Sequence, residues 1–320
     1  MKAAIRHTYG SPDVIRIAET DKPVAGDDDV LVEVRATSLN ASDWEFLTGR
    51  PRYVRTWGLL KPKFEILGSD IAGRVEAVGK NVSQFQPGDE VYGDILGRWG
   101  GLAEYVCAPA DALTRKPAAM SFEQAAAVPQ AGLVALQGLR DKGELQSGQK
   151  VLINGAGGGS GTFAIQVAKV LGAKITGVDS ARKFDTMRAL GADHVIDFAR
   201  EDYTSGGKRY DLILDFVASH PLSANKRALR PGGSYVLVGG SLPRILAAAL
   251  LGPVHSLTGK KMGMLLAKAN EPRDMATMAE FIEAGTVVPI IDKTYPLSEA
   301  AEALRYLGEG QARGKVIVTP

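Results

Sequence analysis

Hydrophobic and polar residues alternate with a two-residue period in the first third of the chain. The segment 29–40, DVLVEVRATSLN, places small and branched apolar residues on one face and mixes charged residues into the other. This period predicts a half-buried strand. Similar short stretches follow, separated by turn-forming residues such as Pro87 and Gly88. We therefore expect a mostly antiparallel β domain up to about residue 120.

The pattern changes near Ser121. Apolar runs such as KVLING (150–155) and SYVLVGG (234–240) alternate with amphipathic stretches such as TFAIQVAKVLGA (162–173). Near-continuous apolar strands between amphipathic helices predict βαβ units and a parallel sheet.

The first pattern returns after about residue 268. We expect a helix over 272–285, a strand over 287–297, a second helix with Ser298 at its N-cap, and a closing strand over 314–320. This tail is expected to pack on the first domain.

Composition narrows the class of protein. The 320 residues are 45% apolar and 23% charged, a globular balance for a chain long enough for two domains. The formal net charge is only +2 and the basic residues are scattered, so neither feature points to a nucleic-acid partner.

The single cysteine, Cys107, excludes an internal disulfide and a multi-cysteine zinc site. The first residues lack the apolar core of a signal peptide, and the run 245–252 is far shorter than the roughly 20 residues that span a bilayer. We expect a cytoplasmic protein without a membrane partner.

A glycine-rich loop carries the most informative pattern. In KVLINGAGGGSGTFAIQVAK (150–169), the strand should end at Asn154 and a helix should begin near Ser160. Ala156, Gly158 and Gly161 have the spacing of the dinucleotide-binding G-x-G-x-x-G motif, with alanine at its first position. Small residues there allow a tight turn, a close approach to a pyrophosphate, and close helix–strand packing. The residues expected at the phosphates are Gly158, Gly159, Ser160, Gly161 and Thr162.

The next strand, KITGVD, gives conflicting signals on the cofactor. Asp179 lies where an acidic residue binds the adenosine ribose hydroxyls, which favours NAD. Ser180, Arg182 and Lys183 follow and are suited to the 2′-phosphate of NADP. A purely solvent-facing role for Arg182 and Lys183 also stays open.

With these residues assembled, the chain resembles the zinc-free quinone oxidoreductase (zeta-crystallin-like) branch of the medium-chain dehydrogenase/reductase superfamily. The resemblance runs nearly end to end. It rests on SLNASDW, ILGSDIAGRVEAVG, FQPGDEVYG, SGQKVLINGAGGGSGTFAIQVAK and GQARGKVIV, which occur in the same order as in that family. The most similar subgroup often uses NADPH and has a serine where Ser180 stands, which favours NADP. Its members usually lack an acid at Asp179, so NAD also stays open.

The resemblance implies an α/β protein of two domains. A GroES-like β-barrel catalytic domain would span 1–122 and be completed by 268–320. A Rossmann domain with a doubly wound parallel sheet would span 123–267, with the active site in the cleft. Dimers are common in the family through the last Rossmann strand, which here would lie near KKMGMLLAK (260–268).

The resemblance also implies that no metal is bound. Zinc-dependent relatives carry cysteine, histidine and cysteine where this chain has Asn40, Ser69 and, nearby, Gln130. Asp70 alone would not hold zinc. The four histidines lie in scattered contexts and are interpreted as structural or surface residues.

The resemblance implies a site assembled from distant segments. Asn40 and Asp43 would be catalytic, with Asn40 facing the nicotinamide ribose or the substrate oxygen, although both also suit a turn cap. Trp44, Tyr53 and Gln130 would line the substrate pocket. For the cofactor, the remaining expected contacts are Phe198 and Phe216 at the adenine, Val238 and Gly239 at the nicotinamide ribose, and Leu265, Leu266 and Arg313 at its far end.

These residues favour an NAD(P)H-dependent, zinc-independent reductase of quinones, enones or reactive carbonyls. A conjugated acceptor spreads the developing negative charge, so it needs a metal less than a simple alcohol or aldehyde does. Two alternatives stay open: an enoyl-thioester reductase on the same fold, and a non-catalytic nucleotide-binding protein.

Overall fold

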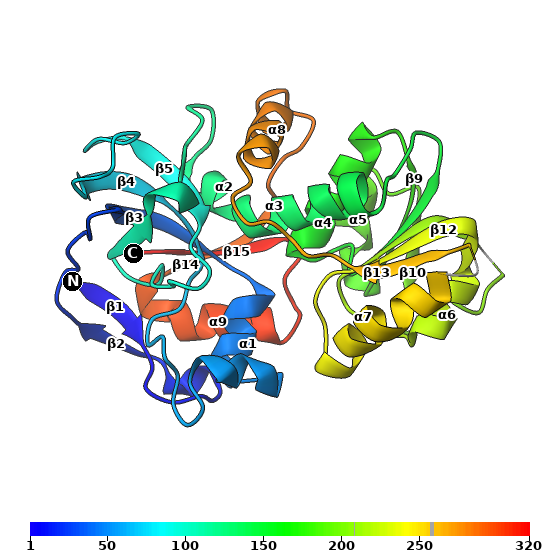
Figure 1. Ribbon diagram of the computed structural model, residues 1–320, viewed down its shortest axis with the longest axis horizontal. Coiled ribbons are helices and arrows are strands. Elements are labelled where there is room, and N and C mark those ends of the chain that lie inside the picture. Colours follow the sequence, from blue (N-terminus) through cyan, green and yellow to red (C-terminus); the bar gives the residue numbers. More distant parts are fainter. Residues whose placement is uncertain (208, 257–258) are drawn as a thin grey trace. The chain divides into compact units, whose positions relative to one another are not determined.

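The computed structural model describes residues 1–207, 209–256 and 259–320, and they form two compact units (Figure 1). The first unit contains Met1–Gln130, Ala269–Glu283 and Pro289–Pro320. The second contains Ala131–Lys268 and Ala284–Val288. Most of the C-terminal segment thus belongs to the first unit, except Ala284–Val288, which belong to the second.

The first unit is built on a 7-stranded sheet with the order β14-β15-β3-β4-β5-β7, and β6 also pairs with β3. Its strands are β3 (Asp29–Leu39), β4 (Asp70–Val78), β5 (Glu90–Asp94), β6 (Tyr105–Pro109), β7 (Thr114–Arg115), β14 (Ile291–Pro296) and β15 (Lys315–Thr319). All neighbours are antiparallel except β14 and β15. On the expected outer face of β3, Leu31 and Thr37 are buried, whereas Arg35 is exposed.

The remaining elements of this unit flank the sheet. They are the two-stranded sheet of β1 (Lys2–Ile5) and β2 (Arg16–Glu19), and the helices α1 (Ala41–Thr48), α2 (Phe122–Ala127), α8 (Pro272–Glu283) and α9 (Ala300–Gly308). Leu39, Leu47 and Leu304 belong to one buried cluster beneath α1 and α9. The prediction that Ser298 is the N-cap of α9 is wrong. A 3-10 turn (Leu297–Glu299) precedes this helix, and Glu299 occupies its N-cap position.

The second unit contains a 6-stranded parallel sheet with the order β10-β9-β8-β11-β12-β13. Its strands are β8 (Lys150–Asn154), β9 (Lys174–Asp179), β10 (His194–Asp197), β11 (Tyr210–Asp215), β12 (Leu229–Leu237) and β13 (Lys261–Met264). The order reverses between β8 and β11, as in a doubly wound dinucleotide-binding sheet. The expected α/β class is therefore confirmed.

Helices cover both faces of this sheet, with α4 and α5 on one side and α6 and α7 on the other (Figure 1). The helices are α3 (Pro129–Leu136), α4 (Gly159–Val170), α5 (Phe184–Leu190), α6 (Leu222–Ala228) and α7 (Leu242–Ser256). Short 3-10 helices span Pro12–Val14, Arg52–Trp57, Ala110–Ala112 and Ala181–Lys183, and a π-helix spans Gln137–Lys142. Both faces being covered explains why the strands are near-continuous apolar runs.

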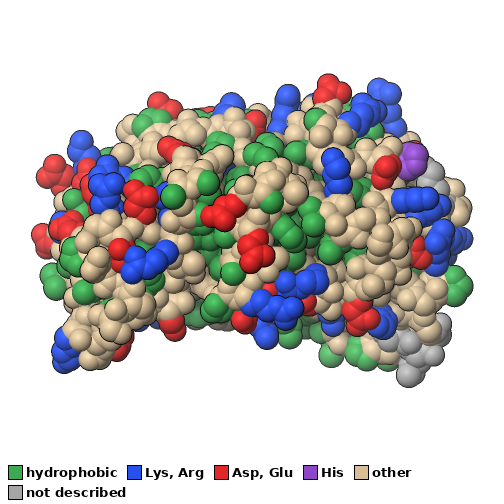
Figure 2. All heavy atoms as spheres, turned by 90° about the horizontal axis from the view of Figure 1, so that it is seen from above, with side chains coloured by type: hydrophobic (Ala, Val, Ile, Leu, Met, Phe, Trp, Pro, Cys, Tyr) green, Lys and Arg blue, Asp and Glu red, His purple; other side chains and the backbone are tan. Residues whose placement is uncertain are grey.

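The surface carries both signs of charge. Acidic and basic side chains are interspersed over the face shown in Figure 2, as the small net charge suggests. Within the residues that the structure describes, no helix is long and apolar enough to cross a membrane.

Candidate active site

The carboxyl ends of the parallel strands meet along one edge of the second unit's sheet, which we call the C-terminal edge. Asn154, the last residue of β8, pairs in register with Asp215 of β11, and Asp215 pairs with Leu237 of β12. Ligands of doubly wound sheets bind outside this edge, where the strand order reverses.

Most of the expected cofactor residues lie directly after these strand ends. The structure places Gly158, Gly159, Ser160, Gly161 and Thr162 after β8, Asp179, Ser180, Arg182 and Lys183 at or after the end of β9, Phe198 after β10, Phe216 after β11, Val238 and Gly239 after β12, and Leu265 and Leu266 after β13. Residues far apart in sequence are thereby brought to one edge.

Three glycines of the loop after β8 are suited to their positions for different structural reasons. Gly155 has φ +87°, a left-handed conformation that other residues rarely adopt. A Cβ on Gly161 would lie 2.1 Å from the carbonyl oxygen of Gly155, so the helix packs against the loop without room for a side chain. A Cβ on Gly158 would meet no protein atom closer than 3.5 Å. Open space beside Gly158 is what a cofactor-binding loop requires.

Helix α4 begins at Gly159, one residue before the expected start, with Gly158 at its N-cap. The first N–H bonded back to this turn is that of Thr162, which donates to Gly158. Within the described part of the chain, the backbone N–H groups of Gly159, Ser160 and Gly161 have no acceptor. Three such groups at a helix N-terminus suit a phosphate.

Asp179 does not present a free carboxylate. Its Oδ2 accepts a hydrogen bond from the Gly157 N–H at 2.9 Å, and its Oδ1 accepts one from the Ser180 N–H at 2.8 Å. The buried Lys183 Nζ lies 3.3 Å from Oδ1. Asp179 thus holds the glycine loop in place through a hydrogen bond, and the Lys183 ammonium group balances the negative charge of Asp179.

The outer residues of the edge are open to solvent. Phe198 is 65% exposed and Leu266 is 79% exposed. Gly239 has φ +75° and open space around its absent side chain. Exposed apolar side chains beside backbone donors are what an aromatic nucleotide base would cover.

A second polar cluster lies in the first unit. We call it the buried polar network, and it consists of Asn40, Asp43, Asp70, Asp94, Gln130 and Lys315. These residues come from the end of β3, from α1, β4 and β5, from the start of α3, and from β15. All except Gln130 are at most 7% exposed.

Asp43 caps the start of α1. Its Oδ2 accepts the Asn40 N–H at 2.7 Å and its Oδ1 accepts the Gly68 N–H at 2.9 Å. Burial raises the pKa of Asp43 to about 6, against the opposing effect of these two hydrogen bonds. Both carboxylate oxygens are therefore committed to structure.

Asn40 stands between a carboxyl group and an ammonium group. Its Nδ2 donates to Asp70 Oδ2 at 2.9 Å, and its Oδ1 accepts from Lys315 Nζ at 2.6 Å. Lys315 Nζ is also 3.8 Å from Asp70 Oδ2. Burial and the nearby Asp94 raise the pKa of Asp70 well above its usual range, and burial lowers the pKa of Lys315.

Gln130 joins the same network. Its backbone N–H donates to Asp70 Oδ1 at 3.2 Å, its Nε2 approaches Asp94 Oδ2 at 3.4 Å, and its Oε1 accepts from Ser42. Burial raises the pKa of Asp94. The structure thus brings Asn40, Asp43 and Gln130 into one hydrogen-bonded cluster.

The other residues expected in the first unit lie apart from this network. Trp44 packs against Gly308 of α9, and the Tyr53 hydroxyl is 3.5 Å from Glu45 Oε2. Arg313 is exposed, and its backbone N–H donates to Asp292 Oδ2.

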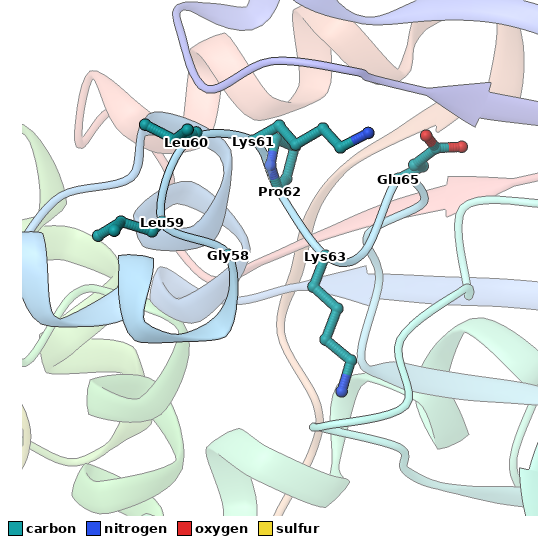
Figure 3. A pocket seen from close by; sticks show the side chains of 7 residues that line it. All are labelled: Gly58, Leu59, Leu60, Lys61, Pro62, Lys63 and Glu65. Carbon is teal, nitrogen blue, oxygen red and sulfur yellow. The ribbon is translucent and has the colours of Figure 1, made fainter.

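A hollow of about 560 Å³ in the same unit is lined by Gly58, Leu59, Leu60, Lys61, Pro62, Lys63 and Glu65 (Figure 3). It contains none of the residues expected in the site.

Sequence reasoning missed Asp70, Asp94 and Lys315 in the first unit, and Asn154 and Asp215 at the C-terminal edge. Asn154 Nδ2 donates to the fully buried Asp215 at 2.8 Å and ties the ends of β8 and β11 together. The available signal was a polar or charged residue at the first or last position of an otherwise apolar strand, as Lys315 is in KVIV.

Comparison with known proteins gives the chain its family. Residues 26–118 match the alcohol dehydrogenase GroES-like domain, and residues 190–318 match the zinc-binding dehydrogenase family. A 2-methylene-furan-3-one reductase from Solanum lycopersicum is 32% identical over 332 residues, covering 100% of this chain and 79% of that protein. The chloroplastic NADPH-dependent alkenal/one oxidoreductase from Arabidopsis thaliana is 31% identical, covering 100% and 80%.

Solved structures agree. The structure of the quinone oxidoreductase from Coxiella burnetii aligns with a TM-score of 0.89 and 28% identity, covering 100% of this chain and 99% of that one. The chain therefore belongs to the medium-chain dehydrogenase/reductase superfamily, in its quinone oxidoreductase family.

Proposed function

We propose that this protein is an NAD(P)H-dependent reductase of quinones and conjugated enones. The C-terminal edge is the observation that carries the proposal. It combines helix N–H groups that find no acceptor in the described ranges of the chain, space beside Gly158 and exposed apolar side chains. The names of similar proteins, an alkenal/one oxidoreductase and a quinone oxidoreductase, support the substrate class.

Residues of the edge would hold the cofactor. A bound reduced nicotinamide supplies the hydride. Gly159, Ser160 and Gly161 would donate to the pyrophosphate, with Thr162 beside them. Phe198 and Phe216 would flank the adenine, and Val238, Gly239, Leu265 and Leu266 would contact the nicotinamide half. The expected contact from Arg313 stays a prediction.

NADPH fits the end of β9 better than NADH. An acidic residue selects NADH by accepting hydrogen bonds from the ribose, and both oxygens of Asp179 already accept from backbone N–H groups. The Lys183 ammonium offsets the repulsion that Asp179 would exert on a 2′-phosphate. Arg182 is exposed with its Nε directed to Ser180 Oγ, and both side chains suit that phosphate. The NADPH-dependent relative agrees with this choice.

The residues in the first unit do not fit the zinc ion that the matched family description implies. Asn40, Ser69 and Gln130 offer two carboxamides and a hydroxyl, whereas zinc prefers thiolate, imidazole or carboxylate. The Asn40 oxygen is bonded to an ammonium group, and the carboxyl group of Asp70 already accepts from Asn40 and Gln130. We therefore propose zinc-independent chemistry.

A homodimer is the proposed assembly. β13 is at one end of the second unit's sheet, and the adjoining α7 exposes Leu246, Leu250, Leu251 and Val254, with Leu250 70% exposed. An unpaired strand edge beside an apolar helix face is suited to a second copy. Leu250→Glu should shift the sedimentation coefficient to that of a monomer, and a monomeric wild-type protein would contradict the assembly.

A cytoplasmic location stays a prediction.

The test follows NADPH oxidation by the purified protein with benzoquinones, conjugated enones and enoyl thioesters, and NADP⁺ reduction with simple alcohols. Both are measured before and after dialysis against a chelator. We expect quinone- and enone-dependent oxidation that survives chelation. Turnover only with enoyl thioesters, or binding without turnover, would favour the two alternative functions. Loss of activity on chelation would refute the zinc-independent chemistry.

A further inference from the structure

Lys315 carries an ammonium group that is buried in the first unit rather than exposed to solvent. The residue is 2% exposed, and its Nζ donates to Asn40 Oδ1 at 2.6 Å and to the Leu39 carbonyl at 3.3 Å. Burying an ammonium group is unfavourable unless its donors are satisfied and a counter-charge is near. Both acceptors belong to the end of β3, so the ammonium group is directed at the segment that presents Asn40.

The ammonium group fixes which way the Asn40 carboxamide points. A lysine can only donate, so the Asn40 oxygen must face Lys315. The Asn40 NH₂ group then faces Asp70, whose Oδ2 accepts one of its two hydrogens at 2.9 Å. Turning the amide over would place its NH₂ group against the ammonium group and its oxygen against a carboxyl oxygen. Only one orientation is therefore compatible with these neighbours.

The same contacts polarise the amide. An ammonium group bonded to a carboxamide oxygen draws electron density away from the nitrogen, and hydrogen bonds in such a chain strengthen one another. The second Nδ2 hydrogen has no acceptor within the network. The titratable groups around Asn40 and Lys315 are Asp43 from α1, Asp70 from β4 and Asp94 from β5.

We propose that Lys315 is a positioning residue that orients and polarises Asn40, whose remaining N–H then stabilises the negative charge that develops on the carbonyl oxygen of the acceptor as hydride adds. The proposal rests on the proposed reductase function and adds to it the residue that acts through Asn40.

A double-mutant cycle tests this dependence. Lys315→Met should lower kcat for a conjugated enone by about 10- to 100-fold, a loss typical of removing a residue that holds a functional side chain in place. The Kd for NADPH should stay within about twofold. Asn40→Ala should have a similar effect, and the double variant should lose no more than Asn40→Ala alone. Multiplicative losses would overturn the proposal, because Lys315 would then act independently of Asn40.

A matched control separates this role from general stability. Lys116 is a second lysine of the first unit, and its side chain is 5% exposed. Its Nζ donates to the carbonyl oxygens of Pro117 and Met120 and forms an ion pair with Glu90. Lys116→Met should lower the melting temperature and leave kcat unchanged in the folded protein. Equal kcat losses in the two lysine variants would overturn the proposal.

Two further measurements cover the case in which Lys315→Met does not fold. Asp70→Asn with Lys315→Met removes both charges and should fold, yet its kcat should stay low. Wild-type kcat in that double variant would overturn the proposal. In the cofactor-free protein, the side-chain amide ¹⁵N resonance of Asn40 should shift between wild type and this variant, and an unchanged resonance would also overturn it. A wild-type protein without enone turnover would instead refute the proposed function.

Discussion

The buried polar network and the C-terminal edge use polar groups in opposite ways. In the network, each charged side chain is buried and bonded to another part of the same unit. At the edge, backbone N–H groups have no acceptor among the residues that the structure describes, and apolar side chains are exposed. The comparison indicates that the network is preorganised during folding, whereas the edge is completed by a ligand. Substitutions in the network should therefore affect folding first, and substitutions at the edge should affect binding.

The largest expected effect comes from breaking the network. Lys315→Met should lower the free energy of unfolding by about 3–5 kcal/mol, because it leaves Asp70 buried without its cation. Urea denaturation of the variant and of Asp70→Asn with Lys315→Met would measure this effect. The double variant should recover a substantial part of the loss. A single variant as stable as wild type would show that the network does not depend on the buried charge.

The pH dependence of stability tests the burial of Asp43. The folded-state pKa of about 6 is above the usual 3.8, so the folded protein binds this proton more tightly than the unfolded chain does. The resulting stabilisation is present below pH about 4 and is lost as the pH rises through about 6. Relative to Asp43→Asn, the wild-type free energy of unfolding should fall by up to about 3 kcal/mol over that window. A pH-independent difference would show that Asp43 titrates normally.

Substitutions of two glycines in the loop after β8 should separate an effect on folding from an effect on cofactor binding. Gly161→Ala should destabilise the protein by about 1–3 kcal/mol, because its Cβ would meet backbone atoms that cannot move easily. Gly158→Ala has room in the protein, so its melting temperature should match wild type while its Kd for NADPH rises at least about tenfold. Thermal melts and calorimetric titration would measure both quantities. Unaltered NADPH affinity in Gly158→Ala would move the phosphate site elsewhere.

The smallest expected effect sharpens the choice of cofactor. Arg182→Ala should weaken NADPH binding by about tenfold and leave NADH binding and stability unchanged, since it removes a charged partner of the 2′-phosphate. Arg188→Ala, an exposed arginine of α5, is the control. Equal losses for both coenzymes, or equal losses in the two variants, would remove the basis for NADPH selectivity.

Local patterns predicted much of the fold and part of the site. The two-residue period of 29–40 located β3, and the glycine spacing located the turn between β8 and α4. The role of Asp179 was not predictable, because its position was visible in the sequence but the two N–H groups that occupy its oxygens were not. Lys315 and Asn40 are 275 residues apart, so only the folded sheet reveals that they are bonded.

The origin of the transferred hydrogen tests the central claim most directly. The protein would be incubated with a conjugated enone and NADPH deuterated at the nicotinamide carbon that donates hydride, and the product would be examined by mass spectrometry and NMR. The account predicts one deuterium at the former β-carbon of the enone, with and without prior chelator treatment. Product that lacks deuterium, or deuterium transfer only when zinc is present, would contradict it.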